Sequence, residues 1–185
     1  MNEKEKMING LHYDAADATL YAERIKCKTL CFKYNQICPE QIAQRQEIIK
    51  KIVGKTKEIF HIEPNFYCDY GYNIELGDNF YSNHNLVILD CAKVTFGDNV
   101  FIGPNSGFYT AEHPLNAKER ITGAEWAKPI NVGNNVWFGG NVTVLAGVTI
   151  GDNTVIGAGS VVTKDIPSNV VAVGNPCKII RKIEN

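Results

Sequence analysis

A six-residue repeat in the second half of the chain limits the possible folds more than any other feature. From Val132 onward the sequence divides into VGNNVW, FGGNVT, VLAGVT, IGDNTV, IGAGSV and VTKDIP. In every unit the first position is apolar and the fifth is small or β-branched, and glycine is common at the second. An α-helix cannot carry this pattern, because its apolar stripe recurs every 3.6 residues.

The same period occurs earlier in the chain, in two blocks that begin at Leu76 and Phe96 and whose registers differ by two residues. Very short strands joined by tight turns suit this pattern, since Gly, Asn and Asp tolerate the left-handed backbone region that such turns use. Three strands make one coil of about 18 residues, and stacked coils bury the apolar column inside a prism. The repeat therefore predicts a mainly β protein built as a parallel β-helix.

The repeat also divides the chain into regions. Residues 1–60 lack it and are rich in Lys, Glu, Ala and Gln, which predicts a helical cap that shields the first coil from edge pairing. Asp14 is expected to cap a first helix, and Pro39 to lie in the first turn of a second helix that ends at Gly54. The β-helix is expected over 61–177 and a basic tail over 178–185. A long loop at about 112–129 interrupts the repeat, and such excursions are commonly functional.

Charge and hydropathy exclude several classes of protein. The 185 residues include 19 Lys and Arg against 20 Asp and Glu, so the chain lacks the positive charge of a nucleic-acid binder. It has no apolar run of membrane-spanning length and no apolar stretch near the N-terminus that would mark a secretory signal. We therefore expect a cytoplasmic protein, without membrane or nucleic-acid partners, whose six cysteines are reduced and mostly buried.

One histidine is placed where chemistry is expected. His113 ends a repeat block directly before the long loop. Only His84 and His113 lie in the repeat region, too few for a three-histidine zinc site, so no metal is predicted. The sequence also lacks a GxSxG nucleophile motif. A single histidine can still catalyse acyl transfer as a general base, by taking a proton from an acceptor hydroxyl and returning it to a leaving thiolate.

Several motifs resemble one known family. These are NFYSNHN, YTAEHPL, the repeat run VGNNVWFGGNVTVLAGVTIGDNTVIGAGSVVTKDIP and the N-terminal GLHYDAAD. The chain resembles the hexapeptide-repeat acyltransferases and is most similar to the maltose and galactoside O-acetyltransferases. The resemblance implies a left-handed parallel β-helix with an N-terminal helical cap and a long loop inserted in one coil. It also implies acetyl-CoA as cosubstrate and a homotrimer with sites between subunits.

The same resemblance implies roles for individual residues. His113, in the HP dipeptide, would be the catalytic base, and Asn83 would supply an amide that stabilises the tetrahedral intermediate. Cys91 stands where some members have a second acidic residue, with Asp90 one position earlier. The residues expected at the sugar hydroxyls are Asp14, Asp69, Asn83 and Cys91.

Acetyl-CoA would bind along a groove between subunits. Small residues let backbone amides approach the pantetheine arm, and basic side chains in the tail would meet the CoA phosphates. Trp137 and Phe138 are expected to be packing residues, with a position beside the cofactor as the alternative for Trp137. The residues matched to the cofactor are Gly140, Ala158, Thr163, Lys164, Lys178 and Arg181.

The leading functional hypothesis is an acetyl-CoA-dependent O-acetyltransferase that modifies a sugar hydroxyl, of the maltose, glucose or galactoside type. Two alternatives remain open at this point. The acceptor could be another hydroxyl compound, such as an antibiotic or serine, since one fold serves many functions. The chain could also be a non-catalytic β-helix that serves as a scaffold; this alternative predicts that CoA does not bind.

Overall fold

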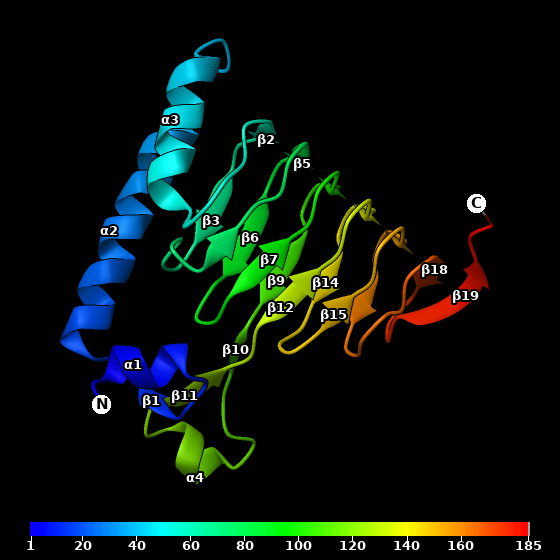
Figure 1. Cartoon of the computed structure of the whole chain (residues 1–185). Coiled ribbons are helices and arrows are strands. Elements are labelled where there is room, and N and C mark those ends of the chain that lie inside the picture. The colour runs from blue at the N-terminus through cyan, green and yellow to red at the C-terminus, as the bar shows by residue number, and fades with distance from the viewer. Residues whose placement is uncertain (185) are drawn as a thin grey trace.

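The structure is a computed structural model that describes residues 1–184. Three parallel sheets form the sides of a prism (Figure 1). The first side contains β2 (Phe60–Ile62), β5 (Phe80–Ser82), β8 (Phe101–Ile102), β13 (Trp137–Phe138), β16 (Val155–Ile156) and β18 (Val170–Val173). The second contains β3 (Phe66–Cys68), β6 (Leu86–Leu89), β9 (Gly107–Tyr109), β14 (Thr143–Val144) and β17 (Val161–Val162). The third contains β4 (Ile74–Glu75), β7 (Val94–Phe96), β12 (Ile130–Val132) and β15 (Thr149–Ile150).

The register of the sheets follows the sequence repeat. Phe138 pairs with Ile156 and Val144 pairs with Val162, so each residue pairs with its counterpart one coil later. The expected fold class is confirmed: the chain is mainly a parallel β-helix, with a helical cap at its N-terminal end and a long insertion in one coil.

The apolar column of the repeat forms the core. Phe138, Val144, Ile156 and Val162 are all fully buried. Four phenylalanines from three successive coils stack edge to face along the axis, with ring centroids 5.0 to 5.3 Å apart. They are Phe80, Phe96, Phe108 and Phe138. Edge-to-face aromatic pairs contribute beyond their buried area, so this ladder joins the coils into one core.

Asparagines fill one row of corners between the first and third sides. Asn99 and Asn135 have φ values of 57°, in the left-handed region that asparagine tolerates better than other non-glycine residues. The side-chain amide of Asn99 donates to Oδ1 of Asn135 at 2.9 Å, and Asn135 donates to Asn153 at 2.8 Å. Asn79 and Asn169 extend this ladder at its two ends. Each turn is therefore bonded to the equivalent turn of the next coil.

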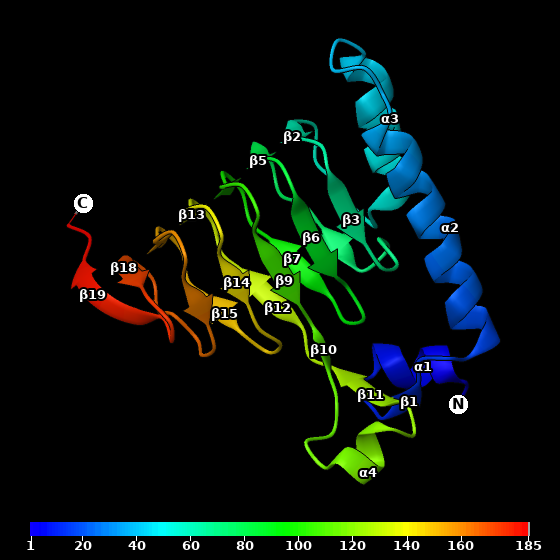
Figure 2. The ribbon, with the colours of Figure 1, turned by 180° about the vertical axis from the view of Figure 1, so that it is seen from behind.

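Two long helices cover the first coil. α2 (Ala18–Asn35) and α3 (Ile42–Ile52) lie side by side against β2 and β3 in both ribbon views (Figures 1 and 2), and the short α1 (Glu3–Ile8) precedes them. Among residues 1–184, no helix combines the length and the apolar character that crossing a bilayer requires.

The expected helix starts need correction. Asp14 is not a helix cap: it lies in the two-residue strand β1 (Tyr13–Asp14), where its Oδ1 accepts from the backbone N of Ala16. The cap of α2 is Asp17, whose side chain accepts from the backbone N of Thr19 and Leu20. α3 likewise begins at Ile42 rather than at Pro39, and it ends at Ile52.

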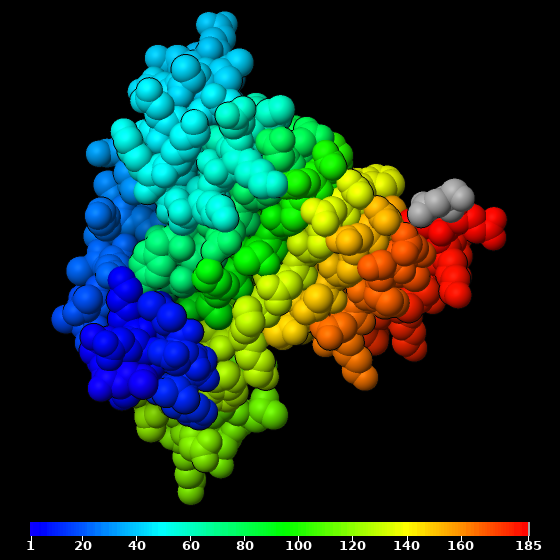
Figure 3. Space-filling model, in the orientation of Figure 1, coloured from blue at the N-terminus to red at the C-terminus, as the bar shows by residue number. Residues whose placement is uncertain are grey.

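The insertion is an ordered arm, defined here as residues 110–129. It contains β10 (Ala111–Glu112), α4 (Ala117–Arg120) and β11 (Ala124–Ala127). β11 pairs antiparallel with β10 on one side and with β1 on the other, so the arm is joined to the N-terminal segment. Figure 3 shows both packed together beside the prism, at the lower left of the view.

The C-terminal segment also differs from expectation. Lys178–Lys182 form a strand, β19, that turns back and pairs antiparallel with β18. The expected basic tail is therefore part of the first side of the prism, although its last residue, Asn185, lies outside the described residues.

Candidate active site

The imidazole of His113 is held by the arm. Its Nδ1 lies 3.2 Å from the carbonyl oxygen of Ala124 in β11. A carbonyl oxygen only accepts hydrogen bonds, so Nδ1 donates in this contact, and Nε2 is the ring nitrogen that can exchange its proton with a ligand while the contact is kept. The side chain of His113 is half exposed, so that Nε2 can reach a bound ligand.

Glu125 is a second member of this site, and sequence analysis missed it. Its Oε2 lies 3.5 Å from Nε2 of His113, and its Oε1 accepts from the hydroxyl of Tyr13. The side chain is only 12% exposed. A buried carboxylate is costly unless it is paired or hydrogen-bonded, and the hydrogen bond from the Tyr13 hydroxyl meets that requirement. Glu125 faces Tyr13 because β1 and β11 pair there. These two segments are distant in the sequence, so no local sequence pattern predicts the contact.

Three of the four residues expected at the acceptor lie near this pair. Asp14 pairs with Ala124, whose carbonyl oxygen contacts His113. Asp69 and Cys91 form a second group, in which the Cys91 Sγ lies 4.0 Å from Asp69 Oδ2. Cys91 belongs to the same buried cluster as Tyr13, which links this group to Glu125.

Burial affects the protonation of both members of the second group, Asp69 and Cys91. It raises the pKa of the Cys91 thiol, so Cys91 is a neutral hydrogen-bond donor rather than a substitute for a carboxylate. Burial also raises the pKa of Asp69, while the positive charges of Lys28 and Arg24 oppose that shift. The Lys28 ammonium lies 4.0 Å from Asp69 Oδ1. Lys28 was not among the residues predicted from the sequence.

Asp90 supports the site by hydrogen bonds to the backbone next to Asp69. Its fully buried carboxylate accepts from the backbone N of Asp69 at 3.1 Å and of Tyr70 at 2.9 Å. Burial raises the pKa of Asp90 to about 6, although the backbone hydrogen bonds from Tyr70 and Asn73 lower it. Asp90 therefore holds the loop that presents Asp69.

Asn83 lies apart from His113 within one chain. It follows β5, at the edge between the first and second sides of the prism, whereas the arm with His113 leaves after β9, at the edge between the second and third sides. The Oδ1 of Asn83 accepts from the backbone N of His84 at 2.7 Å. Within residues 1–184 the Nδ2 group makes no hydrogen bond, so this donor is available for a ligand.

The residues matched to CoA divide between the same two edges. Gly140 and Ala158 follow β13 and β16 and so share the edge of Asn83. Thr163 and Lys164 follow β17, on the edge from which the arm leaves. Lys178 and Arg181 are exposed on β19.

Of the two aromatic residues next to each other in β13, Phe138 packs in the core as expected, and the exposed position of Trp137 leaves only the alternative beside the cofactor. Phe138 lies in the core, whereas Trp137 is 56% exposed on the outside of the first side. The alternation of side chains along β13 places the two rings on opposite faces of the sheet.

Comparisons with known proteins place the chain in a family. Residues 6–57 match the maltose acetyltransferase hexapeptide capping motif, and residues 129–164 match the bacterial transferase hexapeptide, with six repeats. A putative acetyltransferase of Saccharomyces cerevisiae is 53% identical over 184 residues, which are 99% of this chain and 94% of the relative. The chain belongs to the hexapeptide-repeat acetyltransferases.

Two solved structures extend this finding. A maltose O-acetyltransferase from Clostridium difficile 630 is 49% identical and superimposes with a TM-score of 0.97, over 100% of this chain and 99% of that one. A galactoside acetyltransferase in complex with coenzyme A is 44% identical, with a TM-score of 0.96 over 100% of this chain and 92% of that one. The acetyltransferase described here thus shares its whole fold, cap included, with both.

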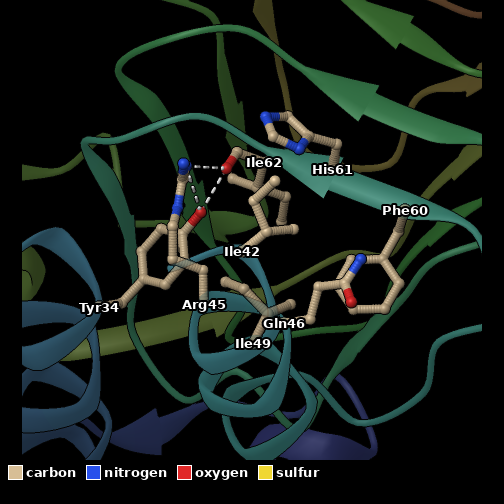
Figure 4. A pocket seen from close by; sticks show the side chains of 8 residues that line it. All are labelled: Tyr34, Ile42, Arg45, Gln46, Ile49, Phe60, His61 and Ile62. Atoms are coloured by element: carbon tan, nitrogen blue, oxygen red, sulfur yellow. Dashed lines mark hydrogen bonds between the residues drawn. The ribbon is translucent and has the colours of Figure 1, made fainter. Parts of the chain in front are cut away.

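A small cavity beneath α3 is not part of the active site of this acetyltransferase. Figure 4 shows the side chain of Arg45 directed at the carbonyl oxygen of Ile62 and the hydroxyl of Tyr34, to which its Nη2 donates at 2.8 and 3.1 Å. The cavity holds about 10 Å³, room for one water at most. We assign these groups to joining the cap to the first coil.

Proposed function

We propose that this acetyltransferase moves the acetyl group of acetyl-CoA to a hydroxyl of a sugar, of the maltose, glucose or galactoside type. The observation that carries the proposal is the orientation of His113. The carbonyl oxygen of Ala124 accepts from Nδ1, so Nε2, which lies beside the Glu125 carboxylate, is the nitrogen that would act as the base. The names of the two similar solved structures support a sugar acceptor.

In the proposed mechanism the acceptor hydroxyl attacks the thioester carbonyl while Nε2 of His113 takes its proton. The imidazolium that forms lies 3.5 Å from Glu125 Oε2, which stabilises the positive charge. The tetrahedral intermediate then collapses, the carbon–sulfur bond breaks, and Nε2 returns the proton to the CoA thiolate. No covalent acyl-enzyme forms in this scheme.

The acceptor region suits a compound with several hydroxyl groups. Carboxylates accept hydrogen bonds from hydroxyls strongly, and Asp14 and Asp69 both belong to this region. The Cys91 thiol fills the remaining wall without a charge. Lys28 partly offsets the negative charge of Asp69, which allows a neutral sugar to bind.

We further propose that a complete site needs two chains. The amide of Asn83 is the expected donor for the oxyanion, but it lies at a different edge of the prism from His113. A homotrimer in which the Asn83 edge of one prism faces the arm of its neighbour would bring them together. Acetyl-CoA would then lie between the chains, near Gly140, Ala158, Thr163 and Lys164, with its phosphates toward Lys178 and Arg181.

The test is thiol release from acetyl-CoA with a panel of acceptors: maltose, glucose, a galactoside, chloramphenicol, serine and none. We expect release that depends on a sugar. His113→Ala is expected to abolish most turnover with little change in CoA affinity, because the base acts in the transition state. Release with chloramphenicol or serine alone would overturn the acceptor class. No release with any acceptor, together with no thermal shift on adding CoA, would overturn the activity itself.

A further inference from the structure

Three cysteine sulfurs meet beneath the helical cap. Cys27 and Cys31 lie on one face of α2, four residues apart, and Cys68 lies on β3. The Cys68 Sγ is 3.4 Å from that of Cys27 and 3.8 Å from that of Cys31, and all three sulfurs lie within 4.8 Å of one another. All three are free thiols that are at most 3% exposed.

The number of ligands decides which ions fit. Sulfur ligands select soft ions, and a closed structural zinc site takes four ligands in a tetrahedron. Within residues 1–184 no fourth histidine, cysteine or carboxylate joins the three sulfurs. The set therefore suits a soft ion with three ligands.

The net charge of the ion bound to three thiolates narrows the choice of ion. The three cysteines lie in the main hydrophobic core, where net charge is costly. The buried carboxylate of Asp90 accepts from the backbone N of Asp69, directly after Cys68, so the nearby charge is negative. A cuprous ion on three thiolates would carry two negative charges, whereas trivalent arsenic on three thiolates is neutral.

Two cavities bring solvent to the cluster. Cys27 lines a cavity of about 240 Å³ that also touches Glu23 and Tyr70. Cys68 lines a second cavity, of about 380 Å³, on the side of Lys28 and Asp69. Arsenous acid is small and uncharged at neutral pH, so its entry from either cavity would not bring a charge into the core.

We propose that Cys27, Cys31 and Cys68 form a binding site for trivalent arsenic. Three S–H bonds and three As–O bonds break, three As–S bonds form, and the three hydroxyls leave as water. The oxidation state of arsenic does not change, so the step needs no oxidant or reductant. The product links α2 to β3 and is independent of the acetyl transfer proposed above.

The test uses the reduced, full-length protein with sodium arsenite. Intact-mass spectrometry is expected to show one adduct per chain, with the mass of one arsenic less three hydrogens. Arsenic X-ray absorption of the wild-type protein is expected to show three sulfur neighbours and no oxygen. Cys31→Ser is expected to leave a two-thiol adduct that retains a hydroxyl. Cys91→Ser, a buried control outside the cluster, and Cys38→Ser, an exposed control, are expected to keep the three-thiol adduct.

Three results would overturn the proposal. The first is a wild-type adduct that retains a hydroxyl or shows an oxygen neighbour, which needs no variant and so does not depend on how variants fold. The second is loss of the three-thiol adduct in Cys91→Ser. The third is displacement of arsenic by Zn²⁺ or Cu⁺ at equal concentration, which would assign the cluster to another ion.

Discussion

Glu125 bridges two residues that are a hundred positions apart in the sequence: one carboxylate oxygen accepts from the Tyr13 hydroxyl, and the other lies 3.5 Å from Nε2 of His113. The N-terminal segment thus contributes to the position of the general base. This bridge makes Glu125 the strongest candidate for a positioning residue in the arm.

Glu125→Gln is expected to lower kcat at least about tenfold, or about 1.4 kcal/mol, with little change in the KM for acetyl-CoA. The amide keeps the size of the side chain but removes the charge that stabilises the imidazolium. Steady-state kinetics with both substrates measures the effect. Glu112→Gln is the matched control, because Glu112 is bonded to Trp126 and Lys128 rather than to His113. Equal losses in both variants would show that the arm as a whole had been disturbed.

Hybrid assemblies test whether two chains share a site. His113→Ala and Asn83→Ala are each expected to be nearly inactive, the latter through a loss of about 2–4 kcal/mol of oxyanion stabilisation. Co-expressed chains are expected to regain part of the activity, since some sites would receive His113 from one chain and Asn83 from its neighbour. The control mixes His113→Ala with the doubly substituted chain, which offers no intact His113. Activity no higher in the first mixture than in the second would place both residues in one chain.

Phe108→Ala is expected to lower the free energy of unfolding by about 3–5 kcal/mol, because it opens a cavity in the middle of the phenylalanine ladder. Denaturant unfolding measures this loss. Phe32→Ala removes the same group from a position that is 66% exposed, and is expected to change the stability by less than about 0.5 kcal/mol. Similar losses of unfolding free energy in the two variants would contradict a special contribution of the phenylalanine ladder to stability.

Asp90 makes the free energy of unfolding depend on pH. Its pKa of about 6 in the folded protein lies above the value of about 3.9 for an unfolded chain. The folded state therefore binds more protons between pH 4 and 6, and the Asp90 contribution to the free energy of unfolding falls as pH rises through this window. The slope is at most about 1.4 kcal/mol per pH unit. The difference between wild type and Asp90→Asn, followed by denaturant unfolding across these pH values, isolates this term. A flat difference would refute it.

The repeat made the β-helix predictable, because each apolar first position must face the axis once the period is six. Local signals were less reliable where two residues could cap the same helix. Asp14 and Asp17 are both acceptable N-cap residues for α2. Because β1 pairs with β11, Asp14 is held in a strand, and Asp17 is the cap. Glu125 and Lys28 were not predicted, because their roles depend on contacts between distant segments. The place of His113 in the arm was predictable, since the break in the repeat marks it.

The antiparallel strand β19 affects how two copies of the protein can associate at their C-terminal ends. A stack of parallel coils presents open backbone groups at its last coil, and another copy could continue the stack there. β19 covers the first side of that coil and carries Lys178, Arg181 and Lys182. Two molecules that approached by these ends would bring like charges together. The positive charges of β19 therefore oppose the end-to-end stacking of two copies.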